Sequence, residues 1–151
     1  LTDFDEYTTN EKQYLALENL TIVNGRVTLA AVEKKGELLF VKRSPENSTP
    51  GRWGFVSGGI KSGESTEEAA VRELMEETGL EAKPVETADY YIGEAEKGYW
   101  RLEPVRMEFI SGEIDLNWEL SEYEWVKPKE VEDHNTIGSL KGFDKLGFQT
   151  E

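Results

Sequence analysis

The sequence predicts a single mixed α/β domain of the α+β type, in which helices cover a mixed β-sheet. The 151 residues suffice for one sizeable hydrophobic core. Apolar runs rich in β-branched residues recur between glycine-containing turns, and one strongly patterned helix lies among them. No repeat or linker divides the chain, so we expect one domain over residues 20–151, preceded by an arm or edge strand over residues 1–19.

The first two strands are expected at Val27 to Val32 and at Leu38 to Val41. The turn between them spans residues 34–37, and Gly36 supplies the backbone freedom that a tight hairpin requires. Residues 45–55 are dense in Pro, Ser, Asn and Gly, so we expect a loop there.

A helix is expected from Ser65 to Thr78. Ser65 can cap its start, and Glu68, three residues later, completes a capping box. Gly79 fits the position just beyond a helix end. The expected buried stripe of this helix consists of four apolar residues: Ala70, Val71, Leu74 and Met75.

The second half of the chain continues the mixed pattern with three more strands and a helix. The strands are expected at residues 85–94, 99–113 and 123–128. A turn from Glu94 to Gly98 joins the first two of them, and Pro128 is expected to open the second helix, through residue 134. His134, the only histidine, is interpreted as a surface residue of that helix.

The composition argues against several classes of protein. A formal net charge of −14 disfavours broad binding to nucleic-acid polymers, which requires clustered Lys and Arg. No apolar run approaches the ~20 residues that cross a bilayer, so no membrane association is expected. The chain has no cysteine and therefore no disulfide or thiolate chemistry. These features are typical of a cytoplasmic protein.

Three glutamates of the expected helix stand where a helix does not favour them. Glu73, Glu76 and Glu77 are spaced i, i+3 and i+4, so they share one face. Their mutual repulsion, and negative charge near the C-terminal end of the helix dipole, each cost up to about 1 kcal/mol. Arg72 relieves only part of this. For the helix considered alone, a solvated acidic face is the simplest explanation.

The glutamates are part of a longer spaced pattern over residues 58–80. The pattern reads Gly58, five residues, Glu64, seven residues, Arg72-Glu73-Leu74, one residue, Glu76-Glu77, one residue, Gly79-Leu80. It resembles the Nudix box, and the chain resembles the Nudix hydrolase family in its MutT-like form. A weaker resemblance extends from about residue 27 to residue 131. Ser57 departs from the pattern, because many members have proline there.

The resemblance implies a bound divalent cation, Mg²⁺ with Mn²⁺ as an alternative. Its ligands would be the backbone carbonyl of Gly58 and the catalytic carboxylates Glu73, Glu76 and Glu77, whose repulsion the cation removes. Structural roles are implied for four further residues of the box: Gly59, Glu64, Arg72 and Gly79. Among these, an ion pair between Glu64 and Arg72 would hold the loop against the helix.

A further catalytic carboxylate is implied in a late loop. Glu119 lies six residues before Trp125, where members of the family place a metal-contacting or base carboxylate. Glu122 is the neighbouring alternative.

Four residues are candidates for substrate binding: Arg26, Arg43, Trp53 and Trp100. A guanidinium can pair with phosphate, and a flat indole can stack on a base. The alternative for each ring is ordinary packing in the core, as it is for Tyr90, Tyr91 and Tyr99.

The resemblance implies metal-dependent cleavage of a pyrophosphate bond in a nucleoside diphosphate linked to another group. The leading substrate is a purine nucleoside triphosphate, with an oxidised purine placed ahead of a nucleotide sugar. An ADP-ribose-type or nucleotide-sugar substrate is the alternative. A non-catalytic nucleotide-sensing module is the alternative from another class, but such modules tend to lose acids of the box. The expected partner is a small-molecule nucleotide, and a homodimer is left open.

Overall fold

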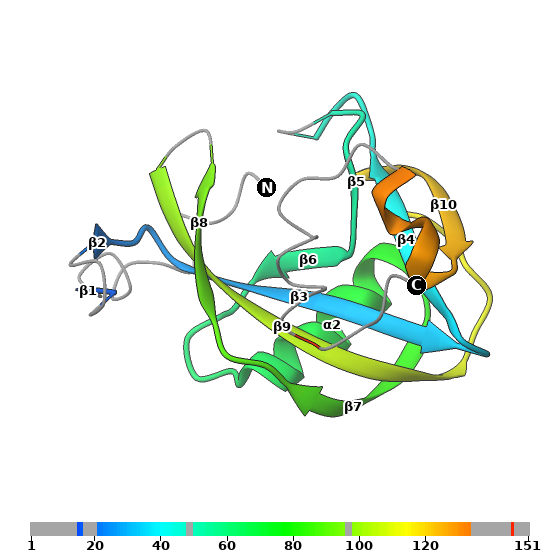
Figure 1. The fold of residues 1–151 in the computed structure, drawn as a ribbon, viewed down its shortest axis with the longest axis horizontal. Coiled ribbons are helices and arrows are strands. Elements are labelled where there is room, and N and C mark those ends of the chain that lie inside the picture. Colours follow the sequence, from blue (N-terminus) through cyan, green and yellow to red (C-terminus); the bar gives the residue numbers. More distant parts are fainter. Residues whose placement is uncertain (1–14, 17–20, 48–49, 96–97, 134–145, 147–151) are drawn as a thin grey trace.

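The computed structural model describes residues 15–16, 21–47, 50–95, 98–133 and 146, and its centre is an eight-stranded mixed β-sheet (Figure 1). The strands are β1 (Leu15–Ala16), β2 (Thr21–Ile22), β3 (Arg26–Lys34), β4 (Glu37–Arg43), β5 (Trp53–Gly54), β6 (Val56–Gly59), β7 (Glu81–Thr87), β8 (Tyr91–Ala95), β9 (Gly98–Ser111) and β10 (Leu120–Val126). The helices in these ranges are α2 (Thr66–Thr78) and the 3-10 helix η2 (Pro128–Asp133). No helix of the described residues is long and apolar enough to cross a membrane.

The main sheet has the strand order β10-β4-β3-β9-β7. Within it, β5 pairs with β4, β6 with β3 and β8 with β9. The central pair β3 and β9 is parallel, and the other pairings are antiparallel. A mixed sheet with a packed helix confirms the predicted fold class. Outside this sheet, β1 and β2 form a two-residue ladder, and residues 1–14 and 17–19 of the expected arm lie outside the described residues.

The hairpin between β3 and β4 is confirmed, and its short pairing leaves the first half of β3 available to β6. Lys35 and Gly36 both have positive φ, at 51° and 82°, as a tight two-residue turn requires. Beyond the turn β3 pairs with β4 over only two positions. Along the same side of β3, β6 pairs with residues 27–30 instead. The glycines at the end of β6 therefore lie beside the first half of β3.

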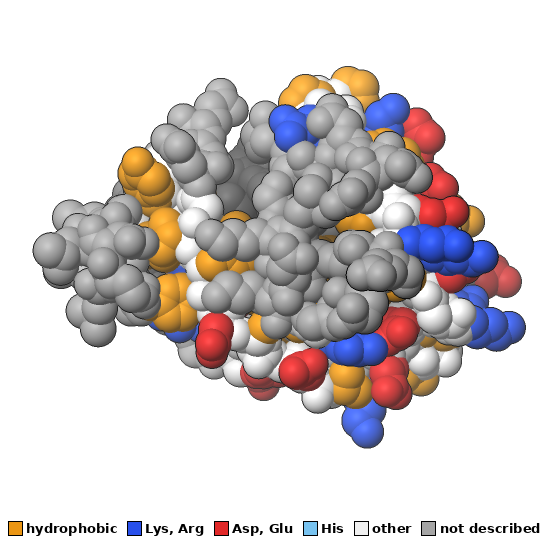
Figure 2. All heavy atoms as spheres, in the orientation of Figure 1, with side chains coloured by type: hydrophobic (Ala, Val, Ile, Leu, Met, Phe, Trp, Pro, Cys, Tyr) orange, Lys and Arg blue, Asp and Glu red, His pale blue; other side chains and the backbone are white. Residues whose placement is uncertain are grey.

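Alternation along β3 divides the core between two faces of the sheet. Val27, Leu29 and Ala31 belong to one cluster, and Ala30 and Val32 belong to the other. The second cluster packs against α2, which lies behind β3 and β9 in Figure 1. The first cluster includes buried residues from the end of β10 and from the segment after it: Val126, Val131 and Leu146. Figure 2 shows acidic and basic side chains interspersed along the right-hand edge of the molecule.

Some expected elements differ from the structure. Residues 85–94 do not form one strand, because β7 ends at Thr87 and β8 begins at Tyr91. Pro84 lies inside β7, and this is tolerated because β7 is an edge strand that pairs only with β9. The segment after Pro128 is a 3-10 helix and not an α-helix. His134 lies outside the described residues.

Candidate active site

Local capping fixes the bounds of α2. The Ser65 hydroxyl accepts a hydrogen bond from the Glu68 amide at 3.0 Å, and the Ser65 amide donates to the Glu68 carboxylate at 2.9 Å. At the other end Gly79 is left-handed, with a φ of 77°, and its amide donates to the Met75 carbonyl. The predicted capping box and helix end are confirmed.

The buried face of α2 carries two of the three box glutamates. Glu73 and Glu77 are only 6% and 2% exposed, and they lie on the sheet side with Ala70 and Leu74. The prediction that Met75 is buried was wrong, because its exposed fraction is 48%. Met75 is two positions from both glutamates, which is about 200° around a helix, so burying Glu73 and Glu77 turns Met75 outward.

Glu76 has a different environment from the other two acids. Its side chain is 52% exposed, and it accepts a hydrogen bond from Nη1 of Arg72 at 3.3 Å. The expected shared acidic face therefore consists of a buried pair, Glu73 and Glu77, with Glu76 at its edge.

Gly58 lies against the carboxylate of Glu73. A Cβ atom at position 58 would be 2.0 Å from Oε2 of Glu73, a separation that no pair of such atoms tolerates. Only glycine therefore allows β6 and α2 to approach so closely with Glu73 in this position.

Arg72 joins the loop after β6 to the helix. Its guanidinium donates to both carboxylate oxygens of Glu64, at 2.7 and 2.9 Å, and to the Gly59 carbonyl at 2.9 Å. It also donates to Glu73 at 3.1 Å. The expected ion pair with Glu64 is therefore present, and this hydrogen bonding lowers the pKa of Glu64. One arginine thus contacts four parts of the box.

Arg43, at the end of β4, brings a buried cation to the same region. It is 4% exposed, and its Nη2 donates to the Ser57 hydroxyl at 3.0 Å. Burial lowers the pKa of Arg43, while the charges of Glu77 and Glu119 oppose that shift. The serine that departs from the usual box pattern therefore accepts a hydrogen bond from this arginine.

The loop between β9 and β10 brings Glu119 to the C-terminal end of α2. The amide of Asp115 donates to the Thr78 carbonyl at 2.8 Å, and the amide of Asn117 donates to the Glu77 carbonyl at 3.0 Å. Two residues after Asn117, the Glu119 carbonyl accepts from the Ser44 amide at 2.8 Å. The charge of Glu119 raises the pKa of Glu77, so the two carboxylates lie within electrostatic reach.

Glu122 does not share this position. Its carboxylate pairs with Lys42 at 3.2 Å, and its side chain is 57% exposed. The structure therefore favours Glu119 over Glu122 as the late acid of the site.

Burial and like charge shift the pKa values of the inner glutamates upward. Burial is the main cause of the rise in the pKa of Glu73 to about 7, which Arg72 opposes and Glu76 supports. Burial also raises the pKa of Glu77 well above its ordinary value, and the charges of Glu73 and Glu119 add to this rise. Both carboxylates therefore resist ionisation in this buried setting, and a bound cation would favour their charged forms.

This donor set fits a hard divalent cation. Among the described residues, no three acidic or histidine side chains are already arranged around one point as metal ligands. Mg²⁺ usually takes only one or two protein carboxylates and completes its shell with water and substrate phosphate. The buried carboxylates Glu73 and Glu77, whose pKa values are raised mainly by burial, match that requirement.

The structure separates the four candidates for substrate binding. Arg43 lies at the acidic cluster, whereas Arg26 pairs with Glu103 at 2.6 Å. Trp100 is 5% exposed and packs in the core, so burial contradicts its expected role in stacking on a ligand. Trp53 is partly buried and packs against the same core cluster.

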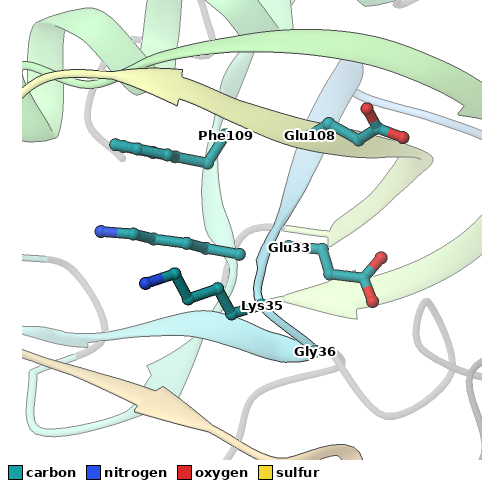
Figure 3. A pocket seen from close by; sticks show the side chains of 6 residues that line it. Glu33, Lys35, Gly36, Glu108 and Phe109 are labelled. Carbon is teal, nitrogen blue, oxygen red and sulfur yellow. The ribbon is translucent and has the colours of Figure 1, made fainter.

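A surface hollow of about 470 Å³ lies away from the cluster of Glu73 and Glu77. It is lined by Glu33, Lys34, Lys35, Gly36, Glu108 and Phe109. Figure 3 shows Phe109 and Lys35 extending to one side and the two glutamates to the other. Its lining residue Glu33 is five positions along β3 from Thr28, the partner of Gly58, or about 17 Å. This hollow is therefore not part of the acidic cluster.

Sequence reasoning missed three residues beside the cluster: Ser44, Asn47 and Trp118. Ser44 and Asn47 are buried and hydrogen-bond to carbonyls of the loop that carries Glu119. Trp118 precedes Glu119 and is 57% exposed. Their placement depends on contacts more than 70 residues apart in the sequence, so no local pattern indicates them.

A family model and a curated relative both match most of this chain. The family model of the NUDIX domain matches residues 24–144. Nucleoside triphosphatase NudI of Escherichia coli O139:H28 (strain E24377A / ETEC) is 30% identical over 112 residues, which cover 66% of this chain and 79% of that protein.

Solved structures share the fold. The solution structure of the E. coli ORF135 protein matches with a TM-score of 0.68 at 24% identity, covering 80% of this chain and 86% of that one. The crystal structure of the MutT protein from Methanosarcina mazei Go1 matches with a TM-score of 0.66 at 24% identity, covering 78% and 88%.

Proposed function

The chain belongs to the NUDIX domain family and is a pyrophosphohydrolase acting on acid anhydrides, and we propose that its substrate is a nucleoside triphosphate and its cation Mg²⁺. The observation that carries the proposal is the buried pair Glu73 and Glu77, with Arg43 and Glu119 within electrostatic reach of Glu77. The substrate class is supported by the similarity to a relative named as a nucleoside triphosphatase.

Glu73 and Glu77 would hold the cation, with Glu76 and the Gly58 carbonyl as additional ligands. A bound divalent cation neutralises phosphate charge and makes a coordinated water more acidic. Mn²⁺ is the alternative ion, since oxygen ligands suit both metals. Arg72 and Glu64 fix the helix against the loop, so that the carboxylates are positioned before substrate arrives.

Arg43 is the residue we assign to substrate phosphate. Its Nε atom is buried and has no hydrogen-bond partner within the described part of the chain, while Nη2 is already bonded to Ser57. A guanidinium matches the geometry of phosphate oxygens and keeps its charge when buried. A substrate phosphate oxygen would accept a hydrogen bond from this Nε atom, and the positive charges of Arg43 and the cation would offset the negative charge of the phosphate.

In the reaction, the oxygen of a water molecule forms a bond to one phosphorus, and the anhydride P–O bond on that phosphorus breaks. The water proton passes to a carboxylate, for which Glu73, Glu77 and Glu119 are the candidates. Variants of the three acids distinguish them.

The test is a substrate panel with purified protein and Mg²⁺. The panel contains purine and pyrimidine nucleoside triphosphates, an oxidised purine triphosphate, nucleotide sugars and ADP-ribose. We expect turnover of triphosphates, and the products, a nucleoside monophosphate with pyrophosphate or a diphosphate with phosphate, report which bond is cleaved. Glu77→Gln is the inactive variant, and Glu122→Gln, at an exposed position, is its matched control.

Two outcomes would replace the proposal. Turnover confined to nucleotide sugars or ADP-ribose would assign the alternative substrate class. Nucleotide binding without any turnover in the presence of Mg²⁺ or Mn²⁺ would indicate a sensing module.

A further inference from the structure

Trp118 is the most exposed large apolar side chain among the described residues, with an exposed fraction of 57%. Its carbonyl oxygen accepts a hydrogen bond from the Ser44 hydroxyl at 2.7 Å. Its indole has no hydrogen-bond or ring partner in the described part of the molecule. Removing so large an apolar ring from water is favourable, so an interaction partner that covered the indole would gain binding free energy.

The exposure of Trp118 occurs in a fixed loop. Upstream, the amides of Asp115 and Asn117 donate to the last carbonyls of α2. Downstream, Ser44 binds the carbonyls of both Trp118 and Glu119. The backbone on both sides of the indole is therefore held, and the ring is presented from a rigid base, which lowers the entropic cost of binding to it.

The same bonds place Trp118 at the edge of the acidic cluster. Asn117, the residue before it, donates to the Glu77 carbonyl at 3.0 Å. Glu119, the residue after it, is within electrostatic reach of Glu77 and Arg43. Neighbouring Cα atoms are about 3.8 Å apart, so the Cα atom of Trp118 lies at about that distance from the Cα atoms of Asn117 and Glu119, which make these two contacts.

We propose that the Trp118 indole stacks on the heterocyclic base of the nucleotide substrate. The proposal rests on the proposed function, since it needs a substrate that carries a base. Phosphate at Arg43 and a base at Trp118 would be bound by two residues that Ser44 connects, because Ser44 follows Arg43 in the chain and binds the Trp118 carbonyl. Stacking tolerates any base, so Trp118 contributes affinity for a base and leaves its identity to other contacts.

A second copy of the chain is a poorer partner for this ring. The loop around Trp118 carries Glu113, Asp115 and Glu119, and the whole chain has a net charge of −14. Two such surfaces repel each other, whereas the neutral base of a nucleotide does not face that repulsion.

The experiment compares Trp118→Ala and Trp118→Phe with Tyr123→Ala, an aromatic control that is 48% exposed on β10. We expect Trp118→Ala to raise KM for a nucleoside triphosphate about tenfold, with kcat changed less, and Trp118→Phe to keep most of the affinity. Tripolyphosphate, which has no base, should inhibit all four proteins with the same Ki. An unchanged KM in Trp118→Ala, or an equal rise in the Ki of tripolyphosphate, overturns the proposal.

Binding is measured separately by tryptophan fluorescence. A nucleotide with a non-hydrolysable triphosphate should quench the emission of wild type, and Trp118→Phe should lose that quenching. Quenching that persists in Trp118→Phe overturns the proposal, as does a shift from dimer to monomer in Trp118→Ala without a change in KM. If wild type hydrolyses no triphosphate, the proposed function fails, whereas quenching through Trp118 would still support the base contact.

Discussion

The backbone of Gly58 approaches the Glu73 carboxylate so closely that a Cβ atom at position 58 would lie 2.0 Å from Oε2. The Glu73 side chain on α2 therefore excludes any residue larger than glycine at position 58 of β6. This close approach also brings the peptide groups of β6 next to the buried acids, where a carbonyl can contact a cation.

Gly58→Ala should displace the Glu73 carboxylate and reduce kcat by at least about 10²-fold, because small errors in positioning have large effects on catalysis. Steady-state kinetics with Mg²⁺ measures the change. Gly51→Ala is the control: its Cβ meets no atom within 4 Å, but its φ of 76° strains alanine. That variant should lose stability, by about 1–2 kcal/mol, and keep its kcat. Equal losses of kcat in both variants would contradict the assignment.

Divalent cation should stabilise the fold through the buried pair. Millimolar Mg²⁺ or Mn²⁺ should raise Tm in wild type, because a ligand that binds only the native state stabilises it by mass action. Glu77→Gln should lose most of this rise. Glu76→Gln should lose a smaller part, since Glu76 is half exposed and bonded to Arg72. Thermal melts with and without metal give the result, and an equal response of wild type and Glu77→Gln would place the metal site elsewhere.

The pH dependence of stability follows from the same carboxylates. The folded pKa of Glu73 is raised from 4.5 to about 7, mainly by burial, and the pKa of Glu77 is raised in the same direction. For an acid, a raised folded pKa gives stability that is fully present below the unfolded pKa and is lost as pH rises through the folded pKa.

Without divalent cation, Tm should therefore fall between pH 5 and pH 8. The rise in Tm caused by Mg²⁺ should be larger at pH 8 than at pH 5, because ionised carboxylates bind the cation. Glu64, whose pKa Arg72 lowers, acts on stability only at more acidic pH. A metal-free Tm that rises from pH 5 to pH 8 would contradict the raised pKa values.

The box contains separate structural and catalytic residues, and two variants should distinguish them. Glu77→Gln should leave the metal-free Tm at or above its wild-type value and lower kcat at least about 10²-fold, because it removes a buried charge needed in the reaction. Arg72→Lys loses the two-oxygen pairing with Glu64, which Lys cannot reproduce, so it should lower Tm. Circular dichroism and kinetics are measured on both, and kcat of Glu77→Gln within a few-fold of wild type would refute its assignment.

How far the sequence predicts this site depends on the range of the interactions. The bounds of α2 follow from Ser65, Glu68 and Gly79, which act on neighbouring residues, so they could be predicted. The hairpin at Gly36 is equally local. The burial of Glu73 and Glu77 in place of Met75 could not be predicted, because apolar periodicity assigns the buried face to the apolar residue.

The aromatic residues show the same limit. Trp100 and Trp118 both precede a charged residue in a polar context, so their immediate neighbours do not distinguish a buried ring from an exposed one. Trp100 lies on β9, where strand pairing and the core cluster bury it. Trp118 lies in a loop whose position depends on bonds to Ser44 and α2. Tertiary contacts therefore decide which ring is available to a ligand.

Glu119 and Glu122 provide the last prediction, because they are three residues apart and lie in different environments. Glu119 is within electrostatic reach of Glu77 and Arg43, whereas Glu122 pairs with Lys42 in solvent. Glu119→Gln should lower kcat by about 10²-fold or more, and Glu122→Gln should change it by less than about twofold. Both should fold with the wild-type circular dichroism spectrum.

Ser44→Ala tests whether the clamp on this loop positions Glu119. The hydroxyl bond to the Trp118 carbonyl at 2.7 Å is lost, but the Ser44 amide still binds Glu119, so the loop is loosened and not released. We expect kcat to fall about three- to tenfold, with a smaller change in the Ki of tripolyphosphate, because the phosphate contact at Arg43 is retained. In Ser44→Ala combined with Glu119→Gln, the serine effect on kcat should disappear, since the carboxylate that it positions is already neutral. If the two effects multiply instead, Ser44 acts on some other part of the site and Glu119 does not depend on it.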